Sequence, residues 1–159
     1  MTSSPACAKN TTPITPLLPP HVSIVSPFET DRSVTEVADI VSEELVKQEV
    51  MDIRFDTLLD YYPSCPLICW GIKMSESLSR LYMGLHTALD IPLPYKKFRP
   101  HVTIGREISE HRLIFVKEKI APYLPEETIN LEEIDLVAPI ARNNWVSVRT
   151  FFLPEREQY

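Results

Sequence analysis

Two short segments of the chain repeat the same arrangement of a histidine and a hydroxyl residue. Residues 20–24 read Pro-His-Val-Ser-Ile, and residues 100–104 read Pro-His-Val-Thr-Ile. Alternate residues of a strand point to the same face of a sheet. Each histidine is therefore expected to project beside the hydroxyl residue of its own segment, with the valine and isoleucine turned to the core. Together the two segments would supply two imidazoles and two hydroxyls.

This set of side chains suits hydrolysis of a phosphodiester. Histidine titrates near neutral pH, so one imidazole can be a neutral base while the other is a charged acid. The base takes a proton from the attacking water, the acid protonates the leaving alkoxide, and the hydroxyls donate hydrogen bonds to the phosphate oxygens. No Asp or Glu accompanies either segment, so we expect neither a metal nor a cofactor. The alternative is two histidines that begin strands and bind backbone carbonyls.

Hydrophobic periodicity predicts the elements that position these segments. Strands are expected over 21–26, 53–59, 67–72, 101–105, 129–137 and 145–152, and helices over 33–48, 75–90 and 109–121. Strand, helix, strand and strand follow His21 and again follow His101, with the second helix between the two units. This internal repeat predicts an α+β fold in which two similar lobes face one another.

With both motifs in place, the sequence resembles the two-histidine (2H) phosphoesterase superfamily, whose signature is a pair of His-x-[Ser/Thr]-x motifs. The surroundings are similar too, since residues 18–28 read LPPHVSIVSPF and residues 98–106 read FRPHVTIGR. The resemblance covers about residues 18–153. It points in particular to the RNA 2′,3′-cyclic phosphodiesterases once called 2′-5′ RNA ligases. It implies a bilobal α+β fold with a pseudo-twofold repeat, in which two small antiparallel sheets face one another across a cleft with helices outside.

The resemblance also implies roles for particular residues. His21 and His101 match the catalytic pair, and Ser23 and Thr103 match the hydroxyls that hold the phosphate. Arg106, which follows the second motif, is implied as a further phosphate ligand.

Three other residues are candidates for contact with a base or with the nucleic-acid backbone. Trp145 falls where family members often carry an aromatic residue, and it could stack on a base or simply pack. Arg99 and Lys97 belong to the basic run 96–106, which lacks acidic residues and flanks His101. That run is either a guide for phosphates or a solvated loop.

Family members usually have a strand and a helix ahead of the first motif, whereas here residues 1–20, with five of the 15 prolines, precede His21. We expect residues 1–20 to form a proline-rich extended arm. Residues 21–159 are expected to form a single bilobal domain, with lobes of roughly 21–72 with 145–153, and 73–144. Either the arm supplies a strand, or that position is empty, or another chain fills it, which would make a dimer.

Composition excludes several other classes of protein. The 159 residues carry a net charge of −6, so a protein that coats nucleic acid by charge alone is excluded, and a nucleotide or short RNA end is the expected substrate. No apolar run is long enough to span a membrane, and no secretory signal is apparent. The three cysteines offer no zinc site, and Cys69 reads as a buried thiol. A reducing, cytoplasmic location fits best.

The sequence therefore predicts a metal-independent phosphodiesterase that acts on 2′,3′-cyclic phosphate ends or 2′,5′-linked nucleotides. Cyclic oligonucleotides are an alternative substrate for the same chemistry. The alternative from another class is a non-catalytic module that binds nucleotides or RNA ends on the same fold. A third possibility is a protein–protein scaffold with vestigial motifs.

Overall fold

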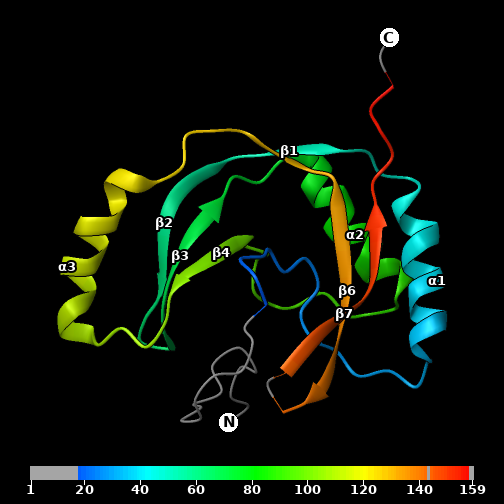
Figure 1. Cartoon of the computed structure of the whole chain (residues 1–159), viewed down its shortest axis with the longest axis horizontal. Coiled ribbons are helices and arrows are strands. Elements are labelled where there is room, and N and C mark those ends of the chain that lie inside the picture. Colours follow the sequence, from blue (N-terminus) through cyan, green and yellow to red (C-terminus); the bar gives the residue numbers. More distant parts are fainter. Residues whose placement is uncertain (1–17, 143, 158–159) are drawn as a thin grey trace.

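The computed structural model describes residues 18–142 and 144–157. Residues 1–17 of the expected arm, and Cys7 with them, lie outside the described residues. The three expected helices and the strands expected over 67–72, 101–105 and 145–152 follow one another in the predicted order (Figure 1). The elements are α1 (Val34–Leu45), β1 (Met51–Ile53), β2 (Phe55–Tyr61), β3 (Cys65–Ile72), α2 (Glu76–Ala88), β4 (His101–Gly105), α3 (Glu110–Ile120), the 3-10 turn η2 (Ala121–Tyr123), β5 (Ile129–Leu131), β6 (Glu133–Ala141) and β7 (Asn144–Phe152).

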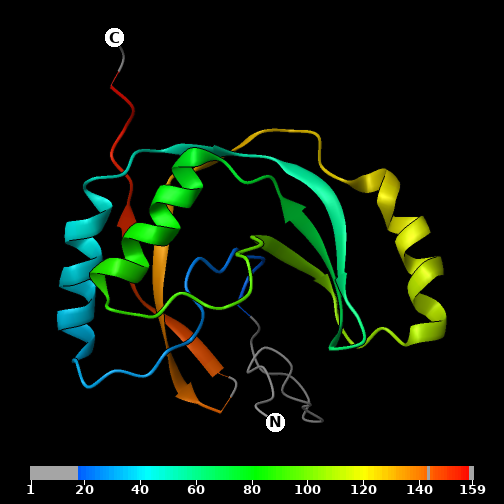
Figure 2. The same ribbon diagram turned by 180° about the vertical axis from the view of Figure 1, so that it is seen from behind.

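The strands of the described residues form three small antiparallel sheets. One contains β2, β3 and β4 in that order, a second is the hairpin of β6 and β7, and the third pairs β1 with β5. In Figures 1 and 2 the β2–β3–β4 sheet curves between α3 and the centre of the molecule, while α1 and α2 lie toward the opposite end. The predicted α+β class with small antiparallel sheets is confirmed. No described helix is long and apolar enough to cross a bilayer.

Two expected strands are each divided in the structure. The strand expected over 53–59 is replaced by β1 and β2, which are separated at Arg54, and the strand expected over 129–137 is replaced by β5 and β6, which are separated at Glu132. In both units the short first strand pairs with its counterpart, whereas the longer strand pairs within its own hairpin. One continuous segment therefore contributes strands to two different sheets. The hydrophobic periodicity of that segment does not show where its pairing changes from one sheet to the other.

The strand expected over 21–26 is reduced to one antiparallel bridge, from Val22 to Val102. The chain bends at Ile24 and Val25 directly after the bridge. Prolines at 19, 20 and 27 have no backbone N–H to donate to a ladder. Pairing therefore stops after one residue, and the rest of the first motif lies along β4 as an extended segment without further bridges.

The internal repeat is visible in the pairing of equivalent residues. The bridge joins Val22 to Val102, the central residues of the two motifs. The strands β1 and β5 occupy equivalent places in the two units, and their central pair is Asp52 and Asn130. Two copies of one unit that pair antiparallel at equivalent positions are related by a twofold axis. A pseudo-twofold axis therefore passes through both pairs.

The main core lies under α1 and α2. Helix α1 begins with the predicted capping box, in which the backbone N–H of Glu36 donates to the Ser33 hydroxyl and the Glu36 carboxylate accepts from the Ser33 N–H. The apolar faces of α1 and α2 pack together with β1 and β7. The buried core residues are Val37, Ala38, Val41, Leu45, Met51, Ile53, Ile72, Leu78, Leu81, Leu85, Leu89, Phe151 and Leu153.

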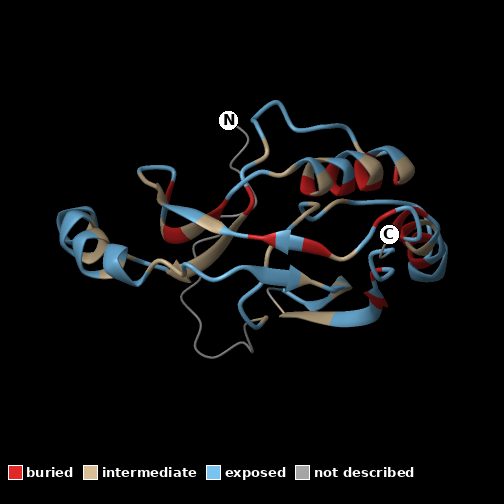
Figure 3. Cartoon of the chain, turned by 90° about the horizontal axis from the view of Figure 1, so that it is seen from above, coloured by how far each residue is buried: buried red, intermediate tan, exposed pale blue. Residues whose placement is uncertain are grey.

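Helix α3 is attached differently from its counterpart α1. None of its residues is buried, as Figure 3 shows at one end of the molecule, and Ile114 and Phe115 are exposed. Ser109 stands at its N-cap but makes no capping hydrogen bond. An ion pair ties the helix to the sheet, since Lys117 Nζ lies 2.6 Å from Asp60 Oδ2. Helix α2 packs beside α1, whereas no described α-helix packs beside α3 in the same way.

Replacement of Leu81 tests whether the α1–α2 core carries the stability of the fold. Leu81 is fully buried, so Leu81→Ala is expected to lower the free energy of unfolding by about 2–5 kcal/mol, because apolar contacts are lost and a cavity remains. Met83 lies on the same helix with 44% of its surface exposed, and Met83→Ala should change it by no more than about 0.5 kcal/mol. Urea unfolding checks both values, and similar losses would contradict this description of the core.

The ion pair between Lys117 and Asp60 makes a pH-dependent contribution to stability. The hydrogen bond from Lys117 lowers the pKa of Asp60 below its ordinary value. A carboxyl whose pKa is lower in the folded state stabilises the fold above its unfolded pKa of about 3.9, and this contribution is lost as pH falls through the lower, folded pKa. Asp60→Asn should therefore cost about 0.5–1 kcal/mol at pH 7, and the difference should shrink below about pH 4.

Urea unfolding at a series of pH values between 7 and 3 measures this difference. Glu118→Gln is the matched control, because Glu118 is an exposed carboxylate beside Lys117 in the sequence. The pH-dependent role of the Lys117–Asp60 ion pair would be contradicted by either of two results. One is a loss of unfolding free energy in Asp60→Asn that persists unchanged at the lowest pH, and the other is an equal loss in Glu118→Gln.

Candidate active site

The Val22–Val102 bridge brings the two predicted motifs into contact. An antiparallel bridge at this pair places His21 opposite Thr103 and Ser23 opposite His101. Directly opposite residues have Cβ atoms about 4.5–5.5 Å apart, and diagonal neighbours about 7–8 Å apart. Each imidazole therefore lies beside the hydroxyl residue of the other motif. The two imidazoles are diagonal neighbours, close enough to serve one phosphodiester group.

The four polar residues share the face that is turned away from the core. Val22 and Val102 pack against the main hydrophobic cluster, and side chains alternate between the two faces of extended backbone. His101 and Thr103 are half-buried, whereas His21 and Ser23 are exposed. The group is therefore open to solvent on the side of the first motif and backed by the β2–β3–β4 sheet on the side of the second.

Both histidines make the same local hydrogen bond. Nδ1 of His21 lies 2.8 Å from the carbonyl oxygen of Pro19, and Nδ1 of His101 lies 2.8 Å from that of Arg99. In each case the acceptor is two residues earlier, and the proline between them fixes its own φ and restricts the preceding residue. A carbonyl can only accept, so we assign the hydrogen to Nδ1 in both rings.

This bond leaves the other ring nitrogen available. Nε2 of His21 and Nε2 of His101 have no hydrogen-bond partner among the described residues. The alternative that the histidines merely bind backbone carbonyls therefore accounts for one nitrogen of each ring. The same bond holds the second nitrogen free of hydrogen in the neutral ring, which is the form that a general base requires.

The second motif is fixed from both sides. The carbonyl of Pro100 accepts a hydrogen bond of 2.9 Å from the N–H of Ile72. Phe98 stacks on Tyr82 of helix α2, with ring centroids 4.0 Å apart and an angle of 6° between the planes. His101 lies opposite Gly71, where an added Cβ would come within 2.5 Å of Thr57 Cγ2. Because residue 71 has no side chain, the side chains of β2 can lie close to its backbone, next to the site.

A buried thiol orients the Thr103 hydroxyl. Cys69 lies opposite Thr103 in the β3–β4 ladder and is fully buried, as predicted. Its Sγ–H donates to Thr103 Oγ1 over 3.7 Å. Burial raises the pKa of the Cys69 thiol, although Thr103 and Arg106 act in the opposite direction. The thiol therefore stays protonated and occupies an acceptor position of Thr103, which leaves the hydroxyl hydrogen free to point at an anion.

Tyr61 is a site residue that the sequence analysis missed. Its hydroxyl oxygen lies 3.1 Å from Nδ1 of His101. Tyr61 ends β2, and a register shift between Asp60 and Tyr61 sets where its side chain points. No motif marks this residue, and a strand pattern alone does not predict such a shift.

The remaining predicted residues differ in how closely they relate to the group. The charge of Arg106 acts to lower the pKa of the Cys69 thiol, and the charge of Arg99 acts to lower the pKa of the Tyr61 phenol. No hydrogen bond, ion pair or ring contact of the described residues links Lys97 or Trp145 to the histidines. Lys97 is exposed, and Trp145 is half-buried on β7 opposite Pro139.

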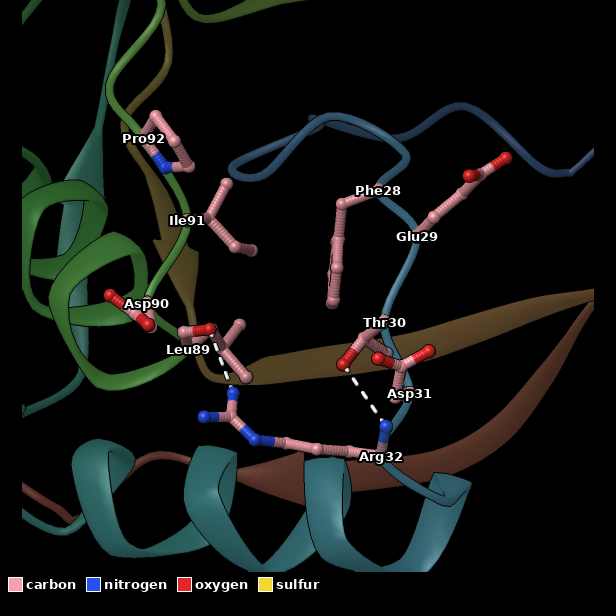
Figure 4. A pocket seen from close by; sticks show the side chains of 9 residues that line it. All are labelled: Phe28, Glu29, Thr30, Asp31, Arg32, Leu89, Asp90, Ile91 and Pro92. Carbon is pink, nitrogen blue, oxygen red and sulfur yellow. Dashed lines mark hydrogen bonds between the residues drawn. The ribbon is translucent and has the colours of Figure 1, made fainter.

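The pocket in Figure 4 is separate from these residues. It has a volume of about 390 Å³ and contains none of the predicted site residues. Arg32 reaches across its floor and donates to the carbonyl of Leu89 over 2.9 Å. Its lining residues are Phe28, Glu29, Thr30, Asp31, Arg32, Leu89, Asp90, Ile91 and Pro92. Among the described residues no cluster of three His, Cys, Asp or Glu side chains is placed to hold a metal ion.

Comparison with known proteins places the chain in a family. A protein named "putative phosphoesterase" from Geobacillus sp. (strain WCH70) is 25% identical over 145 residues, covering 89% of this chain and 83% of the relative. One from Halalkalibacterium halodurans is 27% identical over 149 residues, with 89% and 83% covered. The crystal structure of E. coli LigT complexed with 3′-AMP is 18% identical, with a TM-score of 0.47 and 74% of this chain and 67% of that chain covered.

The family model of the 2′-5′ RNA ligase superfamily matches residues 6–141, which include both histidine motifs. The chain therefore belongs to the 2′-5′ RNA ligase superfamily.

Proposed function

We propose that the chain is a metal-independent phosphodiesterase that uses His21 and His101 as acid and base. The observation that carries the proposal is the Val22–Val102 bridge, which gathers two imidazoles and two hydroxyls on one polar face. The relatives named as phosphoesterases support the same class of reaction. The substrates we propose are 2′,3′-cyclic phosphate ends or 2′,5′-linked nucleotides. Both are phosphodiesters whose hydrolysis requires the same two proton transfers.

The reaction needs one histidine in each protonation state. The neutral imidazole takes a proton from water through Nε2 as the water oxygen bonds to phosphorus. The bond between phosphorus and the departing sugar oxygen breaks, and the second, charged imidazole gives its Nε2 proton to that oxygen. The product is a phosphate monoester beside a free hydroxyl. Proton exchange with solvent then returns both histidines to their starting states.

The hydroxyl residues stabilise charge on the phosphate. Ser23 and Thr103 would donate to the non-bridging oxygens, whose charge changes as the attacking oxygen approaches. Arg106 would add a guanidinium on the Thr103 side. The exposed residues Arg99 and Lys97 would attract the phosphates of a short RNA end. The other expectations, a base stacked on Trp145 and a cytoplasmic location, remain predictions.

Removal of either histidine should abolish most turnover while substrate still binds. His21→Ala and His101→Ala are each expected to reduce kcat for 2′,3′-cyclic AMP in excess EDTA by about 10²–10⁴-fold, because each removes one proton transfer. His111 is an exposed histidine on α3, and His111→Ala should keep wild-type turnover. Binding is followed through the rise in Tm that the substrate causes.

Three results would count against this proposal. Wild-type turnover that depends on a divalent cation would exclude the mechanism written above. A substrate-dependent rise in Tm without any turnover, repeated with a 2′,5′-linked dinucleotide and a cyclic dinucleotide, would favour a binding module. No rise in Tm with any of the three would favour a scaffold.

The hydroxyl of Thr103 should matter more than the shape of its side chain. Thr103→Val keeps the volume and removes the donor, so it is expected to reduce kcat by about 10²–10³-fold. Thr103→Ser keeps the donor and should retain most of the activity. Steady-state hydrolysis of 2′,3′-cyclic AMP, with Tm recorded for both variants, makes the comparison. Equal activity of the two variants would remove Thr103 from the proposed phosphate contacts.

A further inference from the structure

The phenol of Tyr61 makes the two histidines of the site unequal. Tyr61 Oη lies 3.1 Å from Nδ1 of His101, and the ring centroids are 5.1 Å apart with the planes tilted by 49°. The same nitrogen is 2.8 Å from the carbonyl of Arg99. Among the described residues, the ring of His21 has the carbonyl of Pro19 as its hydrogen-bond partner and no side chain. His101 is therefore held at two points and His21 at one.

The phenol can strengthen the hold on His101 in its charged state. Nδ1 carries a hydrogen because the Arg99 carbonyl can only accept, so the phenol oxygen serves as a second acceptor of that hydrogen. Hydrogen bonds strengthen when the donor is charged, and the aromatic face attracts a cation. Burial raises the pKa of Tyr61, against the nearby charge of Arg99, so the phenol keeps its own proton at neutral pH.

The internal repeat offers His21 no equivalent support. Tyr61 is the last residue of β2 and pairs with Cys65, where that hairpin turns. Ala141 is the last residue of β6 and pairs with Asn144, where the second hairpin turns. Neither Ala141 nor Pro139, which lies as far after Asn130 as Tyr61 lies after Asp52, carries a hydroxyl, so the pseudo-symmetry of the site is broken at this position.

We propose that Tyr61 is a positioning residue for His101, which holds the imidazole through Nδ1 and keeps Nε2 available for proton transfer. The proposal rests on the proposed function, and it adds that the two histidines have fixed roles rather than interchangeable ones. The phenol contacts the ring of His101 and not that of His21, so loss of the phenol should affect one of the two proton transfers and leave the other unchanged.

The pH dependence of kcat for 2′,3′-cyclic AMP tests the proposal. Tyr61→Phe should lower kcat by about 3- to 10-fold with KM little changed, and it should move one limb of the bell-shaped profile while the other stays. Tyr62→Phe is the matched control, because it removes a phenol from the neighbouring residue, and it should leave rate and profile unchanged. An unaltered profile in Tyr61→Phe, or the same loss in Tyr62→Phe, would overturn the proposal.

A second measurement does not depend on turnover. Long-range ¹H–¹⁵N spectra of the folded full chain report the ring nitrogens of each histidine separately. Tyr61→Phe should shift the Nδ1 and Nε2 resonances of His101 and leave those of His21 in place. If the wild type hydrolyses no substrate, the proposed function fails, and these spectra still decide whether Tyr61 holds His101. His101 resonances that do not move, or that move together with those of His21, would show that Tyr61 does not hold the ring of His101.

Discussion

The candidate site depends on one contact, the backbone bridge between Val22 and Val102. Neither motif contains enough chemistry by itself, because each supplies one imidazole and one hydroxyl. The bridge sets the register between them, and a shift of one residue would turn the histidine and the hydroxyl residue of one segment toward the core. The valines that form the bridge also pack against the core. Hydrophobic burial on one face of the bridge thereby fixes the positions of the polar residues on the other face.

The fold builds the two halves of the site from one repeated unit and then makes them different. Both histidines bind the carbonyl two residues earlier, and both stand behind a proline. The second is backed by β3, by the Phe98–Tyr82 stack and by the Tyr61 phenol. The first lies on an exposed extended segment. Acid–base catalysis needs two groups in opposite protonation states, and unequal surroundings are a direct way to obtain them.

The sequence predicts the motifs and the order of the elements because both are local properties. The strand over 101–105, the cap at Ser33 and the burial of Cys69 each follow from a few neighbouring residues, and the structure confirms them. The division of the two long strands could not be predicted, because it depends on which segment pairs with which. The contact from Tyr61 to His101 depends on a register shift at the end of β2, and the contact from Cys69 to Thr103 depends on the β3–β4 register.

The central claim is that His21 and His101 act as one catalytic unit, and a double-variant comparison tests it most directly. Hydrolysis of 2′,3′-cyclic AMP in excess EDTA would be measured for the wild type, for each single alanine variant and for the double variant. If the two histidines serve the same transition state, the double variant should be about as slow as the slower single variant, because the effects of groups that act as a unit do not multiply. Losses that multiply would show that the histidines act independently and would contradict this account.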